Sequence, residues 1–414
     1  MAVDAAPRRT GTGTNQEGVR RHNLATMLRQ VHLGGPTSRA ELTAAMGLNR
    51  STIGGLVTEL TSLGLVTVGS APAGPGGARG AGRPSPRVAL AEAGPYVVAV
   101  DLGVDQVVVA RVGLGGVVHE RVRGPVDPDA EAWQVGAGIA ALVRRVVRGA
   151  PAGAPLAGIG MSVPGLVRRS DGLVRLAPNL GWVDVSPGSI ILAALGVDVP
   201  VSLANDADLG ALAEHGRGVG VGIDDLIFVS GNVGVGAGVV AGGQRLEGSG
   251  GYAGEVGHMV FDPEGRDCHC GSRGCFETEV GAHAIAEAIG CPVDAVGSLG
   301  DVLDGYATPP PALHRIGHQL GEGLSGIVNA FNPQVVVLGG YFRALHRLVP
   351  GDIAAGVHAR TLPAPLESLV LSQPGLGADS ILLGAAEMAL EPLLADPVAG
   401  LQASLAEASS RLAG

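Results

Sequence analysis

Hydrophobic residues near the start of the chain recur with the period of a helix. Leu24, Leu28 and Val31 are spaced at i, i+4 and i+7, which predicts an amphipathic helix that ends before Gly34-Gly35-Pro36. Residues 1–17 are small, polar and rich in Gly and Thr, so we expect this segment to be disordered.

Two further helices are predicted by the residues that would cap them. Ser38-Arg-Ala-Glu41 has the spacing of a capping box, and Gly47 ends that second helix. Asn49 can cap a third helix, whose apolar face runs from Ile53 to Leu60. A helix, a short turn and a second helix form the layout of the helix-turn-helix motif, in which the second helix enters the major groove of DNA.

A wing is predicted after these helices. Two short apolar runs, at 65–68 and 87–90, flank a loop that is rich in Gly, Pro and Ala and carries arginines. We therefore predict a winged helix-turn-helix domain over residues 18–90 that binds double-stranded DNA; the alternative is a generic three-helix unit with a linker. The candidate DNA-binding residues, all able to pair with a base edge or a phosphate, are Arg39, Asn49, Arg50, Ser51, Thr52, Arg79 and Arg83.

From residue 94 onward, apolar runs alternate with helical stretches. Strands are expected at 94–112 (strand, turn, strand) and near 156–163, 199–203, 225–230 and 334–338, and helices near 131–149, 207–216, 312–330 and 381–393. This alternation is typical of an α/β fold. Glycine-rich turns are expected at Gly234-Val-Gly236-Ala-Gly238 and at Gly339-Gly340; they could face a ligand or be simple tight turns.

Charge divides the chain in the same way. Residues 1–90 hold ten arginines and four acids, whereas residues 91–414 hold eighteen arginines and thirty-four acids. A small basic unit joined to a large acidic one favours a nucleic-acid reader tethered to another function. All 28 basic residues are arginine, so any mechanism that needs a lysine is excluded. No signal peptide or long apolar run is recognisable, and we expect a soluble cytoplasmic protein that does not enter membranes.

Three of the four cysteines fall within eight residues, at Cys268, Cys270 and Cys275. Three thiolates and one imidazole are the ligand set of a structural Zn²⁺ site, and Gly271 and Gly274 would let the loop turn tightly around it. The fourth ligand could be His258 or His269. A disulfide or plain buried thiols are the alternatives.

Several polar residues could bind a polyol, because sugar hydroxyls need both donors and acceptors. They are Asn179, Asn205, Asp206, Glu255, His258 and Glu277. Asp206 could also act as a general base toward a hydroxyl, and a metal in the cysteine loop would hold Glu255 and Glu277 from both ends. Each residue taken singly is better explained as a turn or cap residue.

Together these motifs resemble the ROK family (repressors, open reading frames, kinases). The resemblance rests on Val163-Pro-Gly165, Asn205-Asp206, Glu255-x-Gly-His258 and Cys268-x-Cys270-Gly-x-x-Gly-Cys275-x-Glu277. It implies an actin-like, ribonuclease-H-like pair of lobes (94–203 with about 375–395, and 204–374) that binds a sugar in the cleft between them. It also implies zinc on His258, Cys268, Cys270 and Cys275, sugar on the six polar residues above, and Asp206 as the base in kinases.

Two departures from the kinase members of that family fall where phosphates would bind. Asp105 stands in the first phosphate turn and Val233 in the second, where the kinases carry a hydroxyl residue. A like charge and a lost donor both oppose phosphoryl transfer, so we expect no enzyme activity. The resulting prediction is a regulator of carbohydrate genes, similar to xylose-, N-acetylglucosamine- or glucose-responsive repressors, acting as a homodimer or tetramer. The alternatives are an ATP-dependent hexose kinase and a regulator controlled by a protein partner.

Overall fold

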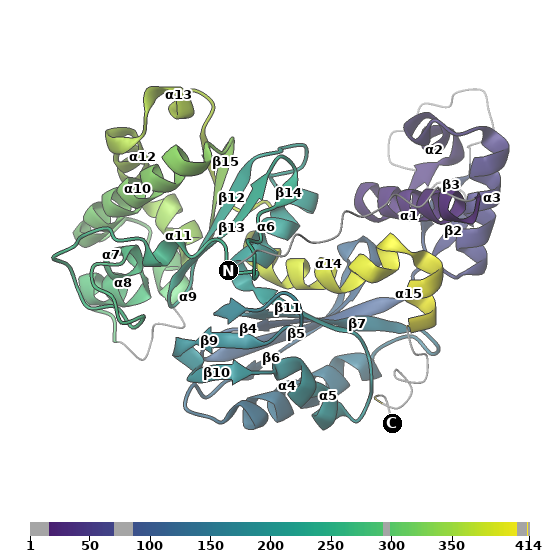
Figure 1. Ribbon diagram of the computed structural model, residues 1–414, viewed down its shortest axis with the longest axis horizontal. Helices are drawn as coiled ribbons and strands as arrows, with labels where there is room; N and C mark the ends of the chain where they lie inside the picture. The colour runs from purple at the N-terminus through teal and green to yellow at the C-terminus, as the bar shows by residue number, and fades with distance from the viewer. Residues whose placement is uncertain (1–15, 70–85, 293–298, 404–411, 413–414) are drawn as a thin grey trace, which may run out of the picture. The chain divides into compact units, whose positions relative to one another are not determined.

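The computed structural model describes residues 16–69, 86–292, 299–403 and 412, and its chain forms two compact units (Figure 1). The N-terminal unit comprises Met1–Gly94 and Pro392–Gln402, and the main unit comprises Pro95–Glu391 and Ala403–Gly414. The wing loop, with Arg79 and Arg83, lies outside the described residues. None of the helices in the described ranges combines the length and the apolar character needed to cross a lipid bilayer.

The N-terminal unit contains the three predicted helices and a small sheet. The helices are α1 (Gln16–Gly34), α2 (Arg39–Met46) and α3 (Arg50–Ser62), and the strands β1 (Thr37–Ser38), β2 (Val66–Gly69) and β3 (Arg87–Leu90) pair in the order β1-β3-β2. Helix α1 begins at Gln16, so the last two residues of the segment expected to be disordered are helical. The sequence analysis missed β1, because two residues carry no readable alternation.

Both predicted caps are confirmed. Ser38 Oγ accepts a hydrogen bond from Glu41 N at 3.1 Å, and Glu41 Oε2 accepts one from Ser38 N at 2.7 Å. Asn49 Oδ1 accepts from Thr52 N at 2.9 Å and so starts α3. The end of α14 (Ser380–Ala395) and α15 (Pro397–Ala403) complete this unit, where Arg21 pairs with Asp396 at 3.3 Å.

Two five-stranded sheets form the frame of the main unit. The first has the order β11-β7-β4-β5-β6 and contains β4 (Tyr96–Leu102), β5 (Gln106–Gly113), β6 (Val118–Pro125), β7 (Leu156–Val163) and β11 (Val201–Asn205). The second has the order β14-β13-β12-β15-β16 and contains β12 (Leu226–Gly231), β13 (Val235–Ala241), β14 (Gln244–Arg245), β15 (Val335–Gly340) and β16 (Val370–Ser372). This is the α/β pattern expected from the sequence.

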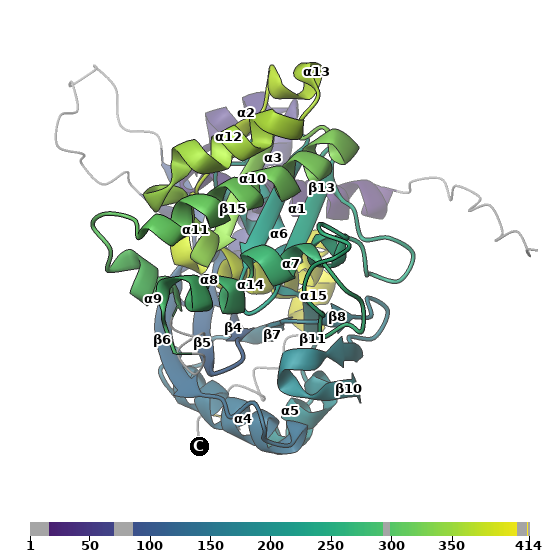
Figure 2. The same cartoon turned by 90° about the vertical axis from the view of Figure 1, so that its left-hand side faces the viewer.

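Helices cover both sheets. Helices α4 (Ala132–Arg148) and α5 (Pro187–Leu195) lie on the outer face of the first sheet (Figure 1). The second sheet is covered by α10 (Pro311–Phe331), α11 (Tyr341–Leu348) and α12 (Pro350–Arg360) (Figure 2). The remaining elements are β8 (Leu166–Val167), β9 (Val174–Ala177), β10 (Trp182–Val185), α6 (Asp206–Arg217), α7 (Phe276–Val280), α8 (Ala282–Ile289), α9 (Leu299–Asp304) and α13 (Pro363–Leu366).

The expected glycine-rich turn at Gly234–Gly238 is wrong in its extent. Gly236 and Gly238 lie inside β13, paired with β12, and only the residues before Val235 form the turn. The reason is packing: a Cβ on Gly238 would lie 2.3 Å from the backbone oxygen of Ala207 in α6. These glycines therefore let a helix approach the sheet closely.

A fully buried carboxylate joins α6 to the start of α14. Glu214, near the end of α6, accepts hydrogen bonds from the backbone N–H groups of Val219 (3.0 Å), Gly375 (2.9 Å) and Leu376 (3.0 Å). Ser380, the first residue of α14, donates to it through Oγ at 2.7 Å. One turn further along, Arg217 pairs with Glu387 of α14 at 2.5 Å. Buried charge is tolerated here because its oxygens are fully bonded.

Removing this carboxylate should destabilise the main unit. Glu214→Ala removes the acceptor of three part-buried backbone N–H groups and of the buried Ser380 hydroxyl, so we expect the free energy of unfolding to fall by about 2–4 kcal/mol. Urea denaturation followed by tryptophan fluorescence measures it, because both tryptophans, Trp133 and Trp182, belong to the main unit. The exposed Glu367→Ala is the control, with a change within about 0.5 kcal/mol. Equal effects of the two variants would contradict the assignment.

Candidate functional site

A cavity of about 590 Å³ opens in the main unit, and its wall is formed by strand ends and loops of both sheets. All six residues that the sequence singled out for a sugar line this one cavity: Asn179, Asn205, Asp206, Glu255, His258 and Glu277. They come from segments up to about 100 residues apart in the chain, and the fold brings them together. Their role in binding a sugar stays a prediction.

Asn205 and Asp206 stand where β11 ends and α6 begins. Asn205 caps α6, because its Oδ1 accepts from Ala207 N at 2.8 Å, and its Nδ2 donates to the Gly165 carbonyl at 3.1 Å. Asp206 is 8 % exposed, and its Oδ2 accepts a hydrogen bond of 2.6 Å from the side-chain amide of Asn232. Asn232 was not among the site residues predicted from the sequence.

Burial controls the protonation of the acids around Asp206. It raises the pKa of Asp206 to about 6, although the hydrogen bond from Asn232 acts against the shift. Burial also raises the pKa of Asp208 to about 7 and raises the pKa values of Asp101 and Glu255. Asp101, which accepts from Ser162 Oγ at 2.6 Å, adds its negative charge to the shift of Asp206. A carboxyl group with a pKa in this range can exchange a proton near neutral pH, as a general base must.

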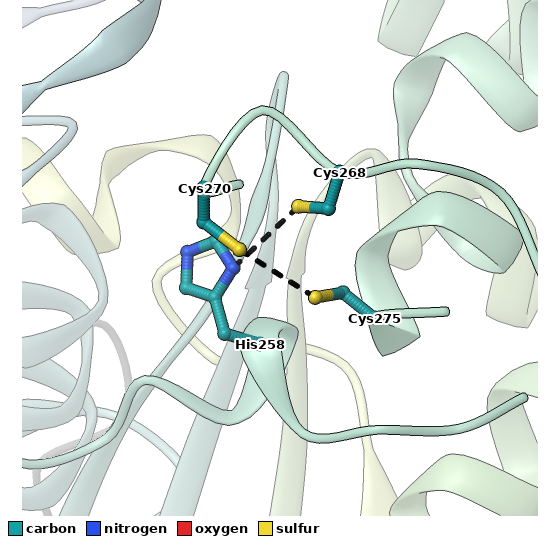
Figure 3. Close-up of side chains that lie close together, drawn as sticks. All are labelled: His258, Cys268, Cys270 and Cys275. Atoms are coloured by element: carbon teal, nitrogen blue, oxygen red, sulfur yellow. Dashed lines mark hydrogen bonds between the residues drawn. The ribbon is translucent and has the colours of Figure 1, made fainter. Parts of the chain in front are cut away.

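Next to these acids lies the cysteine cluster (Figure 3). The ligand atoms of His258, Cys268, Cys270 and Cys275 all lie within 4.8 Å of one another. Cys270 Sγ and Cys275 Sγ are 3.7 Å apart, and Cys268 Sγ is 3.8 Å from Nδ1 of His258. The four cysteines are free thiols, so the disulfide alternative is wrong.

The two closest printed separations fit a tetrahedral metal site, and all four ligand atoms lie within 4.8 Å of one another. Ligands about 2.3 Å from a central ion at tetrahedral angles are separated by about 3.8 Å, as the two measured pairs are. The choice left open by the sequence falls on His258, because His269 lies outside the cluster and packs edge-on against His283. The four side chains could therefore hold one metal ion.

Glu277 connects the cluster to the cavity. Its Oε1 accepts from Cys268 Sγ at 3.1 Å, and its Oε2 accepts from the backbone N–H of Val235 at 3.4 Å. The backbone N–H of Ser272 lowers the pKa of Cys270, whereas burial raises the pKa of Cys268. An ion held by the thiolates would fix the loop that carries His258 and Glu277, and so the wall of the cavity.

Both departures from the phosphate-binding pattern line the same cavity. Asp105 is exposed in the turn between β4 and β5, which closes through a hydrogen bond of 2.8 Å from Gly103 N to the Gln106 carbonyl. Val233 stands in the turn between β12 and β13. At these two turns the cavity therefore presents one carboxylate and one apolar side chain.

In the N-terminal unit, α3 presents a polar face. Arg50 and Ser51 are exposed there, and Arg39 is exposed at the start of α2. Asn49, Ser51 and Thr52 are also engaged in the cap, since Asn49 Oδ1 accepts from both hydroxyls. The middle of α3 carries Gly54 and Gly55, and a Cβ at either position would meet nothing within 4 Å.

Two adjacent glycines in a helix are costly, by about 1 kcal/mol each relative to alanine. No neighbouring group among the described residues requires them in α3. Close approach of another molecule to the backbone is a reason to keep them. The sequence analysis missed this signal.

Comparisons with known proteins place the chain in a family. The model of the ROK family matches residues 97–391, so the chain belongs to the ROK family. It is 30 % identical to the xylose repressor of Bacillus spizizenii over 384 residues, covering 92 % of this chain and 98 % of that one. It is 28 % identical to the glucokinase of Halalkalibacterium halodurans, with coverage of 70 % and 93 %.

A solved structure has the same architecture. The crystal structure of a ROK family transcriptional regulator, a homologue of the E. coli MLC protein, superposes with a TM-score of 0.72 and 25 % identity. It covers 93 % of this chain and 98 % of that chain, so the shared fold extends into the N-terminal unit. The expected actin-like α/β fold is confirmed.

The raised pKa of Asp206 gives the stability of the main unit a predictable pH dependence. The folded state binds this proton more tightly than the unfolded state, so stability falls as pH rises from about 4 to about 6, by at most roughly 3 kcal/mol. Asp206→Asn removes this cost and should be more stable than the wild type at pH 8 but not at pH 4. Urea denaturation at both pH values measures it, with the exposed Asp129→Asn as the control. A variant less stable than wild type at pH 8 would show that the charge is not destabilising.

Proposed function

We propose that the protein is a sugar-responsive transcriptional regulator, acting as a repressor of carbohydrate genes. The observation that carries the proposal is coverage: the similarity to a xylose repressor spans 92 % of the chain and so includes most of the N-terminal unit. The capped α2–α3 pair with its exposed arginines supports binding to double-stranded DNA. The polar cavity supports a sugar effector, and the first one to test is xylose.

A sugar can act on DNA binding only if its affinity differs between two states of the protein. In our proposal the sugar closes the two sheets of the main unit around the cavity and changes the freedom of the winged helices. Two copies of the chain would place two recognition helices about 34–36 Å apart on a near-palindromic operator.

Kinase activity is the second candidate, because Asp206 has the burial and the raised pKa of a general base and the relatives include a glucokinase. The residues at the two turns oppose it, since phosphoryl transfer needs donors and cations around the phosphates. A coupled assay with ATP and a panel of hexoses decides between the two functions. Turnover by the wild type that is abolished in Asp206→Asn would show that the protein is a kinase.

Zinc is the metal that we propose for the cluster, because three thiols and one imidazole converge within 4.8 Å of one another. When bound, the ion would supply a fixed cross-link between η3 (Val256–His258) and the loop before α7. Nδ1 of His258 faces the sulfurs, so the other ring nitrogen is left to face the cavity.

Replacing one ligand should remove the metal. We expect about one zinc per chain in the purified wild type and a large loss in Cys270→Ser, because three ligands hold zinc much less tightly than four. Mass spectrometry for metals measures the content. Cys291→Ser is the matched control, since this cysteine lies outside the cluster. Equal zinc in both variants, or none in the wild type, would be incompatible with the proposed site.

Substitutions in α3 should separate helix stability from DNA binding. Gly55→Ala should stabilise the helix by up to about 1 kcal/mol yet weaken DNA binding, and Arg50→Ala should cost about 1–3 kcal/mol of binding. Gel shifts on a duplex selected from a random library by the wild type measure binding.

The control for Gly55 is Gly138→Ala in α4. This glycine is also helical, exposed and without a neighbour within 4 Å of an added Cβ. It should stabilise the protein by a similar amount and leave DNA binding unchanged. If Gly55→Ala and Arg50→Ala both bind like the wild type, α3 is not the recognition helix.

A further inference from the structure

The cavity extends beyond the six predicted sugar residues. Its far half is lined by the turn between β4 and β5, by α8, and by the ends of α9 and α11, with polar side chains from Gln106, His283 and Asp301. Within the described part of the chain these three side chains make no hydrogen bond or ion pair; His283 makes only its ring contact with His269. Polar groups that line a cavity without partners are free to meet a ligand.

The charge of the lining excludes one kind of ligand. Eight carboxyl groups but only two guanidinium groups, those of Arg266 and Arg343, line the cavity. Arg266 pairs with Glu287 at 2.5 Å, and Arg343 pairs with Asp304. No unpaired arginine among the lining residues is therefore left for a phosphate, and the excess of carboxylates repels one.

The size of the cavity and the chemistry of its lining both suit a ligand larger than one sugar ring that carries hydroxyl groups. A volume of about 590 Å³ lies within the range of pockets that enclose a drug-sized ligand, and such a ligand is larger than one sugar ring. Hydroxyl groups suit the far half, because they can accept from the amide of Gln106, exchange either role with His283, and donate to Asp301.

From these observations we propose that the effector is an uncharged saccharide of at least two rings. One ring contacts the residues around Asp206 and Glu255, and the next ring occupies the far half against Gln106, His283 and Asp301. This inference rests on the proposed function, in which the cavity holds the effector. It names the class of effector: a neutral di- or oligosaccharide, and neither a sugar phosphate nor a nucleotide.

Calorimetry on the full-length protein tests the class. The probes are xylose with xylobiose, glucose with cellobiose and maltose, glucose 6-phosphate, and a non-hydrolysable ATP analogue. We expect at least one disaccharide to bind 10-fold or more tightly than its own monosaccharide, and the two phosphorylated probes to bind at least 10-fold more weakly than that disaccharide. The same disaccharide should release the selected DNA duplex at a lower concentration than its monosaccharide.

Variants of the far half locate the second ring. Asp301→Ala combined with His283→Ala should weaken disaccharide binding about 10-fold while changing monosaccharide binding less than 2-fold. Loss of folding would weaken both ligands equally, so the ratio of the two affinities is the readout. Asp129→Ala, exposed and outside the cavity, is the control and should change neither affinity.

Each other outcome overturns the inference, and the outcomes also separate it from the proposed function. If a monosaccharide binds as tightly as every disaccharide and releases DNA, the proposed regulatory function is retained and the two-ring effector is rejected. The same holds if a phosphorylated probe binds most tightly, or if the far-half variant keeps the melting temperature of the wild type and still weakens mono- and disaccharide binding alike. If no neutral saccharide in the panel binds at all, the inference and the proposed sugar response fall together.

Discussion

The main unit depends on one buried carboxylate. Glu214 gathers four hydrogen-bond donors from the segments that surround the start of α14, and it lies on the helix whose first residue, Asp206, faces the cavity. The two helices also touch through backbone, since a Cβ on Gly384 would lie 2.0 Å from the Leu209 carbonyl oxygen. These contacts hold α6 and α14 together as one closely packed pair.

Much of this architecture could be predicted from the sequence, where local signals are strong. The caps at Ser38 and Asn49 and the buried strand β7 were readable from a few residues. Strand β6 was missed because it is an edge strand, in which Val122 is the one buried residue and the others are half-buried or exposed. Strand β13 was mistaken for part of a turn, because its glycines serve a helix that is distant in sequence.

Some features of the candidate site could be predicted from the sequence and others could not. The metal cluster could be predicted because its ligands are close in sequence, and the structure added only the choice of His258. The common cavity of Asn179, Asp206 and Glu277 could not be derived from spacing; it followed from the resemblance to a family. Asn232, His283 and Asp301 escaped notice because their position in the cavity depends on the packing of both sheets, which no local pattern records.

The N-terminal unit is assembled from two distant pieces of chain, and this limits how such regulators can recombine. The segment Pro392–Gln402 belongs to it, and Asp396 supplies the partner of Arg21. A crossover between related genes that exchanged only the first 94 codons would separate the N-terminal unit from its own C-terminal segment, Pro392–Gln402. Only an exchange of both segments would keep the N-terminal unit's own contacts, among them the ion pair of Arg21 with Asp396.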